Sequence, residues 1–294
     1  MDIRVLKYFL AIAREESLSG AAEILHITQP TLSRQIMELE EELGCKLLIR
    51  GNRKISLTED GMFLRKRAEE ISSLFDRTLL EFESVKDIIS GDIYIGGGES
   101  EAMSLIAKTI KRFKNDFPNV HFHLYSGNSE DVSDRLDKGL LDFGLLLEPC
   151  DIRKYDFIRL NHHDTWGLLM KKDSPIANKT GITPDDLCNL PILTPRNSLA
   201  ANEFSNWCKE NYEKLNIVAS FNLIYNASLL VREDIGYALC LDKLVNTSCE
   251  SDLCFVPLVP NVEVGLDLVW KKHKSFSKAA TKFLDYLKED LQTV

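Results

Sequence analysis

Hydrophobic positions in the first sixty residues recur at helical spacing, and residues that favour helix ends separate them. A short helix is predicted after Ser17, a favoured N-cap residue, and it runs to Leu25. A second helix is predicted after Thr28, with Pro30 in its first turn and Gly44 as its stop. The positions expected to be buried on this second helix are Ile36, Leu39 and Leu43. Two short helices joined by a turn predict a helix-turn-helix.

The leading face of the second helix carries side chains that can hydrogen-bond to phosphates or to base edges in a major groove. Beyond Gly44, the apolar runs 47–49 and 55–57 flank a Gly51-Asn52 turn, which predicts a two-stranded basic wing. The acids expected to point away from DNA are Glu38, Glu40, Glu41 and Glu42. The candidate DNA-binding residues are Thr28, Gln29, Pro30, Thr31, Ser33, Arg34, Gln35, Arg50, Arg53 and Lys54. An ordinary helical pair with a solvated charge run is the alternative.

A long helix is predicted after Thr58, and Ser90-Gly91 ends it. Its apolar positions alternate in steps of four and three, which is a heptad seam that favours pairing with a second copy. The seam positions are Leu64, Ala68, Ile71, Phe75, Thr78, Phe82, Val85 and Ile89. A two-fold homodimer would present two recognition helices to an interrupted dyad in DNA.

From residue 91 to 294, apolar strands alternate with helices, which predicts α/β lobes with parallel strands. The first lobe is expected at about 91–161 and 267–294, and the second at about 162–266. A cleft is expected between them, where strand ends and helix N-termini converge. The strands expected in the second set are 166–170, 192–194, 218–222 and 237–241, followed by a returning strand at 266–270 and a final helix from Ser275.

Ser100 is the first candidate for binding a small anion in the cleft, because it follows a strand and opens a helix. The full set of effector-binding candidates is Ser100, Glu99, Asn128, Ser129, Thr194, Arg196, Asn197, Ser198 and Asn226. Simple helix capping is the alternative role for many of them. Glu99 and Glu148 would repel a carboxylate or favour a cationic or polar effector, so the charge of the ligand stays open.

The N-terminal segment resembles the signature of LysR-type transcriptional regulators, and the rest resembles their effector domain less specifically. The N-terminal match includes Ala21, Ala22, Thr28, Gln29, Ser33, Gln35, Leu39, Gly44, Leu47, Arg50, Arg53 and Gly61. Residues 117–120, 139–142 and 231–239 carry the second match, although Glu233-Asp234 stands where small residues are usual. Leu48 and Gly20 also depart from the pattern.

The resemblance implies an α/β protein with an α-rich winged helix-turn-helix at 1–60, a dimerising linker helix at 61–90 and an effector domain at 91–294. That last domain is expected to be two-lobed and similar to a periplasmic binding protein. The partners implied are promoter DNA and a small-molecule effector such as a carboxylate. A homotetramer built from two dimers is also implied. RNA polymerase is left open as a further partner.

Composition agrees with this interpretation but requires local basic patches, because the net charge of the 294 residues is −9. The seven cysteines show no pairwise zinc spacing, and an odd count argues against a disulfide framework. Arg4, Lys7 and Arg14 interrupt the first apolar stretch, so we expect a cytoplasmic protein without membrane contact. No metal or cofactor is predicted.

Two other classes of protein are alternatives to a DNA-binding regulator. An enzyme is disfavoured because neither His121 with His123 nor the run from His162 to Asp164 supplies a complete catalytic or metal-binding set. The turn at 96–98 also lacks the spacing of a dinucleotide or phosphate-binding loop. A solute-binding module without DNA function is the third class, and residues 1–60 argue against it.

Overall fold

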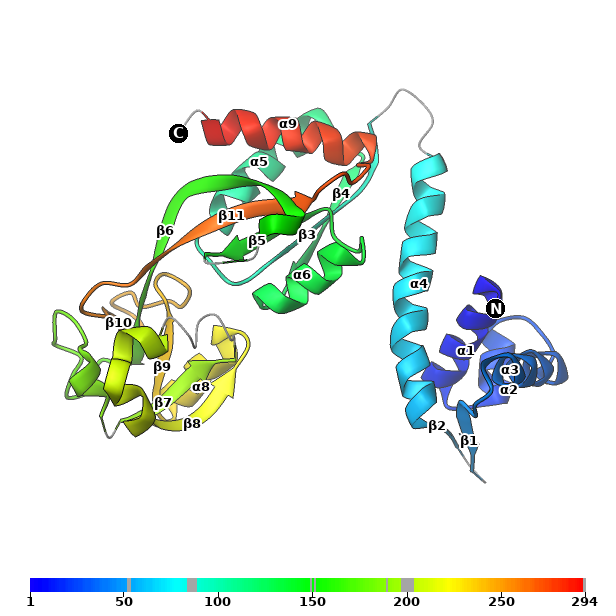
Figure 1. The fold of residues 1–294 in the computed structure, drawn as a ribbon, viewed down its shortest axis with the longest axis horizontal. Helices are drawn as coiled ribbons and strands as arrows, with labels where there is room; N and C mark the ends of the chain where they lie inside the picture. The colour runs from blue at the N-terminus through cyan, green and yellow to red at the C-terminus, as the bar shows by residue number, and fades with distance from the viewer. Residues whose placement is uncertain are drawn as a thin grey trace. The chain divides into compact units, whose positions relative to one another are not determined.

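The chain forms two compact units, Met1–Val85 and Lys86–Val294. The computed structural model describes residues 1–51, 54–83, 89–148, 150, 152–188, 190–196 and 204–292 (Figure 1). The elements of the first unit are α1 (Ile3–Glu15), α2 (Leu18–Ile24), α3 (Gln29–Leu43), β1 (Leu48–Arg50), β2 (Ile55–Leu57) and α4 (Glu59–Glu83).

The helix-turn-helix of the first unit has the caps that its sequence predicts. The Ser17 hydroxyl accepts a hydrogen bond from the Gly20 amide at 3.2 Å, and Thr28 accepts one from Thr31 at 3.4 Å. Gly44 ends α3 in the left-handed conformation, with φ of 70°. The buried stripe is confirmed at Ile36 and Leu39, which are 0% and 1% exposed. Leu43 was expected to be buried as well but is 41% exposed, since it lies in the last helical turn beyond the core.

The predicted wing is a short antiparallel hairpin. β1 pairs with β2 so that Leu48 faces Leu57, and the Gly51 amide donates to the Lys54 carbonyl at 3.1 Å. Residues 52 and 53, including the candidate Arg53, lie outside the described residues, as does the side chain of Arg50. The hairpin joins the core through Leu47, which is 1% exposed.

The expected heptad seam is wrong at Leu64, Ala68 and Ile89. Leu64 and Ala68 are 8% and 0% exposed because they pack into the core of their own unit, so they are not free for a second copy. Ile89 is not on α4, which is described only to Glu83, and it packs instead against the hydrophobic core of the second unit. Apolar spacing alone does not distinguish a core-facing helix stripe from a pairing seam.

The second unit is an α/β fold built on a connected sheet with strand order β4-β3-β5-β11-β6-β9-β7-β8, and β10 pairs with β6. Its strands are β3 (Gly91–Gly97), β4 (Val120–Ser126), β5 (Phe143–Leu147), β6 (Tyr155–Lys171), β7 (Pro191–Pro195), β8 (Asn216–Phe221), β9 (Tyr237–Leu241), β10 (Leu253–Pro257) and β11 (Glu263–Lys271). Its helices include α5 (Met103–Asp116), α6 (Ser129–Asp137), α8 (Ile224–Arg232) and α9 (Lys278–Gln292), with 3₁₀ turns at Ile152–Lys154, Pro184–Leu187 and Lys209–Lys214.

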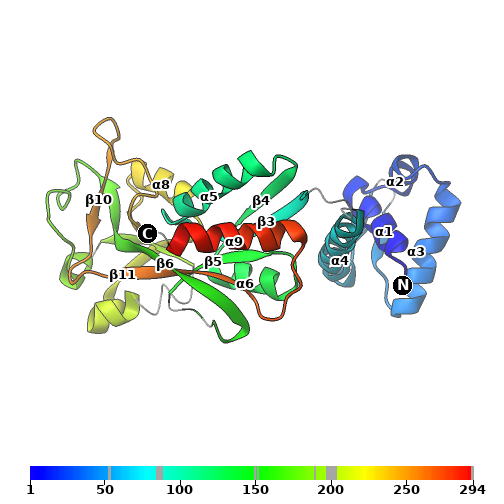
Figure 2. The ribbon, with the colours of Figure 1, turned by 90° about the horizontal axis from the view of Figure 1, so that it is seen from above.

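Two lobes with separate cores confirm the two-lobed prediction. In the first lobe, β3 runs parallel to β4 and β5, and the core lies beneath α5 and α9 (Figure 2). α6 packs on β5 and β11 through Val132 and Leu136. In the second lobe, β7 runs parallel to both β8 and β9.

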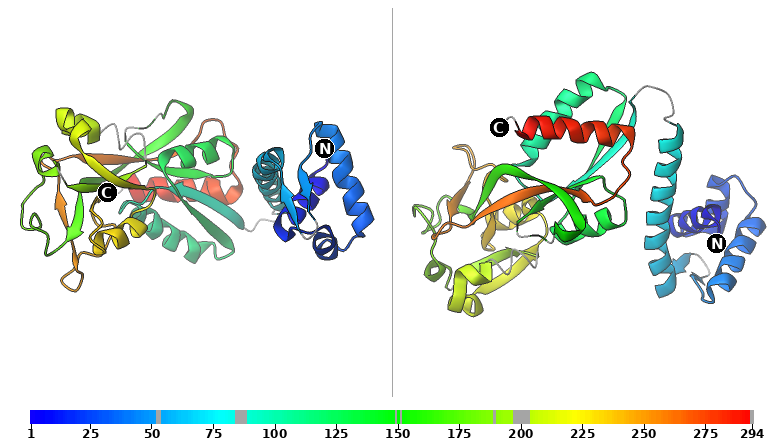
Figure 3. Two further views of the ribbon diagram at one scale, coloured as in Figure 1. Left: turned by 90° about the horizontal axis from the view of Figure 1, so that it is seen from below. Right: turned by 45° about the horizontal axis from the view of Figure 1, so that its top comes forward.

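The antiparallel strands β6 and β11 run side by side from one lobe into the other (Figure 3). Leu160 and Leu266 belong to the core of the first lobe, whereas Trp166 and Val264 belong to the core of the second. β6 begins at Tyr155, so the strand expected at 166–170 is only the distal end of a longer crossing strand. The lobes are thus joined by two paired strands whose register shifts between Gly265 and Asp267.

Candidate functional site

The first candidate site is the solvent-facing side of α3. Leu32 and Ile36 are fully buried and hold one side of the helix on the core, so Gln29, Thr31 and Arg34 on the other side face solvent. Arg34 is 70% exposed. Pro30 lies in the first turn, where its missing N–H removes no helical hydrogen bond. The geometry therefore presents polar side chains at the N-terminal end of a firmly packed helix.

Neighbouring elements fix the start of this helix. The Ser19 hydroxyl of α2 donates to the Gln29 side-chain oxygen at 3.1 Å, which connects the two helices across their turn. The hydroxyls of Thr28 and Thr31 are 2.8 Å apart and hydrogen-bond to each other. Ser33 is half-buried. These hydrogen bonds reduce the conformational freedom of the Gln29 and Thr31 side chains.

The expectation that the acids point away from the candidate residues is wrong for Glu38. Its carboxylate lies 3.5 Å from the Arg34 guanidinium and accepts a hydrogen bond from Gln35 at 2.8 Å. The physical reason is spacing, because residues three and four apart share one face of a helix. On the wing, the Lys54 ammonium likewise pairs with Glu16 at 2.5 Å, and this contact raises the lysine pKa. Both cations are therefore paired with exposed carboxylates.

Glu40 lies on the buried side of α3, away from the exposed face as expected, but sequence reasoning missed its role. It is 6% exposed, and one of its oxygens accepts hydrogen bonds from the backbone amides of Leu47 at 2.9 Å and Leu48 at 3.3 Å. The other oxygen binds Lys46 at 2.6 Å. Burial alone raises the Glu40 pKa, but these hydrogen bonds outweigh it and hold the pKa below its ordinary value. Glu40 therefore attaches the base of the wing to the end of α3.

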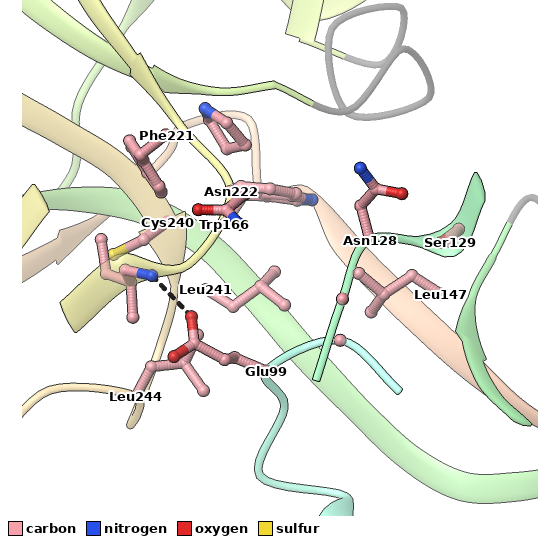
Figure 4. Close-up of a pocket in the computed structure, with 14 residues that line it drawn as sticks. Glu99, Asn128, Ser129, Leu147, Trp166, Phe221, Asn222, Cys240, Leu241 and Leu244 are labelled. Carbon is pink, nitrogen blue, oxygen red and sulfur yellow. Dashed lines mark hydrogen bonds between the residues drawn. The ribbon is translucent and has the colours of Figure 1, made fainter. Parts of the chain in front are cut away.

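The second candidate site is a pocket between the lobes, with a cavity volume of about 80 Å³ (Figure 4). It lies at the carboxyl ends of the parallel strands of both lobes, which is where ligands bind in open α/β sheets. The residues that line it are Gly98, Glu99, Gly127, Asn128, Ser129, Leu147, Trp166, Pro195, Phe221, Asn222, Ile224, Cys240, Leu241 and Leu244.

The pocket includes three of the candidate effector residues, Glu99, Asn128 and Ser129. Asn128 is the N-cap of α6 and accepts a hydrogen bond from the Asp131 amide at 2.8 Å. Glu99 crosses from the first lobe to the second, where its carboxylate accepts a hydrogen bond from the Ile224 amide at 2.5 Å. Figure 4 shows this contact at the edge of the pocket.

Other candidates lie elsewhere. Ser100 is 8% exposed and its hydroxyl accepts from the Ala102 amide at 3.0 Å, so it acts as a local cap and is not among the described lining residues. Thr194 is half-buried within β7, and Arg196 is exposed one residue beyond the lining residue Pro195. The lining set also omits Asn226, which is exposed on α8. Two further candidates, Asn197 and Ser198, lie outside the described residues.

Most of the apolar lining was missed by sequence reasoning. Trp166, Phe221 and Leu241 come from three strands of the second lobe and meet only after folding. Burial, followed by the charges of Asp242 and Glu99, raises the pKa of the Cys240 thiol, which therefore stays neutral in the wall of the pocket. The sequence signal that could have found lining residues is the end of a predicted strand, because the lining residue Asn222 directly follows β8.

The remaining acid considered for the cleft, Glu148, is neutralised outside the pocket. Its carboxylate forms an ion pair with Arg159, which also contacts Asp267 at 3.3 Å. Within the described part of the chain, no three His, Cys, Asp or Glu residues gather as a metal site. No described helix has both the length and the apolar character needed to cross a membrane.

The fold and the two sites define a regulator with a helix-turn-helix and a ligand-binding domain, and family comparison places the chain. The family model for bacterial regulatory helix-turn-helix proteins of the lysR family matches residues 3–62. The model for the LysR substrate binding domain matches residues 87–292. The chain therefore belongs to the LysR family of transcriptional regulators, with a DNA-binding and an effector-binding domain.

Relatives match along nearly the whole chain. The Hca operon transcriptional activator HcaR of Escherichia coli is 27% identical over 301 residues, covering 100% of this chain and 99% of the relative. The uncharacterised regulator YnfL of the same organism is 25% identical, covering 98% of each chain. Full-length CbnR in complex with its target DNA is 20% identical, with a TM-score of 0.75 and coverage of 99% of this chain and 100% of that one. This structural likeness supports the fold.

Proposed function

We propose that the exposed face of α3 reads promoter DNA at an interrupted dyad and that the wing contacts the adjacent backbone. The observation that carries this proposal is the polar face of α3, where Gln29, Thr31 and Arg34 project from a helix whose opposite side is buried. Arginine and glutamine make the bidentate hydrogen bonds that distinguish bases in a major groove. Further contacts to phosphates or bases are proposed for Thr28, Ser33 and Gln35 of the helix-turn-helix and for Arg50, Arg53 and Lys54 of the wing.

The ion pairs of Arg34 and Lys54 are compatible with selective binding of DNA. Glu38 holds Arg34 and Glu16 holds Lys54 while DNA is absent, and both pairs are exposed. Exposed ion pairs contribute little to stability, so exchange of the carboxylate for a phosphate or a guanine edge has a small energetic cost. The acidic net charge of −9 then restricts binding to sites where this local face fits.

A second copy of this chain is proposed to pair along α4. Phe63, Ile71 and Leu74 are 64%, 41% and 43% exposed. Their spacing places them on one side of a helix with 3.6 residues per turn. Aligned exposed apolar side chains of this kind are typical of a helix–helix interface. A two-fold dimer would present two α3 helices to related half-sites, and two such dimers would form the tetramer that the family resemblance implies.

The pocket is proposed to bind the effector that controls DNA binding in the cytoplasm. Its walls come from both lobes, so a ligand there contacts each lobe at once. Such a ligand shifts lobe geometry only if it binds one arrangement more tightly than the other. The consequence for the regulator is a change in tetramer geometry or in DNA bending, with contact to RNA polymerase as a further step.

Arg34→Ala tests the DNA site directly. We expect site-specific DNA affinity to fall about tenfold to a hundredfold, because a lost base or phosphate contact has that scale of effect. Arg4→Ala is a matched control, since Arg4 is also highly exposed and paired with a carboxylate but lies on α1. Fluorescence anisotropy with the full chain provides the measurement. Equal affinity of the Arg34 variant and the wild type would remove Arg34 from the interface.

A further inference from the structure

We infer that the pocket between the lobes selects a compact, largely apolar ligand that carries a protonated amine and a hydrogen-bond acceptor, rather than a carboxylate. This inference rests on the proposed effector role of the pocket and specifies the chemistry of its ligand. Three features of the pocket point to this chemistry: the position of Glu99, the surrounding charges and an indole donor without an acceptor among the described residues.

Glu99 already occupies the position that would attract an anion. The N-terminus of α8 favours negative charge because its first amides lack helical acceptors. Leu223, the N-cap residue, provides no side-chain hydrogen bond there. The Glu99 carboxylate of the first lobe instead accepts this hydrogen bond from the Ile224 amide of the second lobe, with 2.5 Å between the carboxylate oxygen and the amide nitrogen. A carboxylate ligand would therefore meet a carboxylate of the protein at this helix end.

Among the described residues of the wall, no other side chain compensates this negative charge. Among the described lining residues there is no Lys, Arg or His. The raised pKa of Cys240 keeps that thiol neutral, and the described side chain of the nearby Arg196 is exposed beyond the lining set. Within the described residues, the Glu99 carboxylate accepts one hydrogen bond, from the Ile224 amide. A carboxylate can accept several hydrogen bonds, so Glu99 can also accept one from a ligand.

Aromatic and apolar groups surround this acceptor. Trp166 and Phe221 lie in the same wall as Leu147, Leu241 and Leu244. Aromatic faces attract cations, and the attraction strengthens when the cation leaves water. A carboxylate beside aromatic rings in an otherwise apolar cavity suits an ammonium group with a hydrocarbon body.

Trp166 is a second, independent indicator of a ligand. Its side chain is 7% exposed, yet its indole Nε1 has no acceptor among the described residues. A buried donor without a partner is unfavourable, and such groups normally find one. Figure 4 shows the indole across the pocket with its nitrogen turned toward the side where Asn128 lies. An amide, hydroxyl or carbonyl oxygen of the ligand would satisfy this donor.

The test uses leucinamide, which combines an amine, an amide oxygen and a branched hydrocarbon. The comparison probes are 4-methylpentanamide, which lacks only the amine, and the anion 4-methylpentanoate. Each is titrated calorimetrically into the full chain at about pH 6.5, where an α-amino group is protonated. We expect saturable millimolar or tighter binding of leucinamide and at least about tenfold weaker binding of both comparison probes.

Glu99→Gln separates charge from helix capping, because the glutamine oxygen still accepts from Ile224. It should weaken leucinamide binding about tenfold or more, while Glu101→Gln, the same charge change outside the lining set, leaves binding unchanged. Trp166→Phe keeps an aromatic ring and removes the donor, so it should weaken both amides. Equal or tighter binding of 4-methylpentanoate, no saturable leucinamide binding, or leucinamide binding unaffected by Glu99→Gln overturns the ligand class.

A DNA footprint with the same probes tests separately whether the pocket binds this ligand class and whether ligand binding there controls DNA binding. If leucinamide binds through Glu99 but leaves the footprint unchanged, the ligand class stands and regulation through the pocket fails. If 4-methylpentanoate binds more tightly and changes the footprint, regulation through the pocket stands and the proposed ligand class fails.

Discussion

Replacing Glu40 with alanine should detach the base of the wing from the end of α3. The variant removes the acceptor of two buried backbone amides, at 2.9 and 3.3 Å, and the partner of Lys46. Hydrogen bonds to charged groups contribute about 1.5–3 kcal/mol each, and water entering the gap recovers part of that. We therefore expect about 2–4 kcal/mol of local destabilisation. Glu41→Ala is the control, because Glu41 is the exposed neighbour on the same helix.

Hydrogen exchange of peptides covering residues 45–58 measures this loss, and tryptophan fluorescence provides an internal reference. The three tryptophans lie at 166, 207 and 270, so their unfolding transition reports the second unit and should not change. DNA affinity should fall with wing protection. If the wing of the Glu40 variant exchanges no faster than that of the Glu41 variant, the proposed attachment is wrong.

The same contact predicts a dependence on acid pH. Because the folded state lowers the Glu40 pKa, its stabilisation is present above the ordinary glutamate pKa of about 4.3 and is lost as pH falls through the folded value. Wing protection in the wild type should therefore decline in acid. Glu40→Gln should show a smaller decline, measured as exchange rates corrected for intrinsic chemistry, whereas parallel pH profiles for the two proteins would contradict the assignment.

Three further predictions concern the interface, the base of the wing and the thiols. Leu74→Asp should shift the dimer toward monomer in analytical ultracentrifugation, because it places a charge on the apolar face of α4; an unchanged sedimentation coefficient would exclude this face. Gly61→Ala should destabilise the first unit by about 1–3 kcal/mol in denaturant unfolding, since the added methyl group would overlap the Leu47 carbonyl oxygen; wild-type stability would show that the backbone there adjusts freely. Burial, with a smaller effect of Cys188, raises the pKa of Cys208 to about 12. Mass spectrometry after iodoacetamide treatment at neutral pH should therefore find the exposed Cys249 alkylated well before Cys208. The reverse order would contradict the burial of Cys208.

Features set by neighbouring residues could be predicted from the sequence. Ser17, Thr28 and Gly44 mark helix ends because each acts on backbone groups only a few residues away. The wing was predictable for the same reason, since its two strands are joined by a short turn. The Arg34–Glu38 ion pair also follows from helical spacing, because residues four apart share one face of a helix.

Features that depend on distant packing were not predictable in this way. Glu99 and the α8 N-terminus are 125 residues apart in sequence, and their contact exists only after both lobes form. Leu64 and Ile89 share an apolar spacing with the exposed positions of α4, yet they pack into two different cores. The polar residues 162–164 concealed the continuity of β6, because backbone pairing with β11 sustains that strand.

This chain is proposed to bind specific promoter DNA and to change that binding when the pocket is occupied. The most direct measurement is a footprint on DNA upstream of its own gene and neighbouring operons, with and without a small-molecule extract of the source cells. We expect protection across an interrupted dyad and a change in the length of the protected region when extract is added. Failure to protect any specific site across genome-wide fragments, at low and moderate salt, would contradict the account and favour a solute-binding module instead.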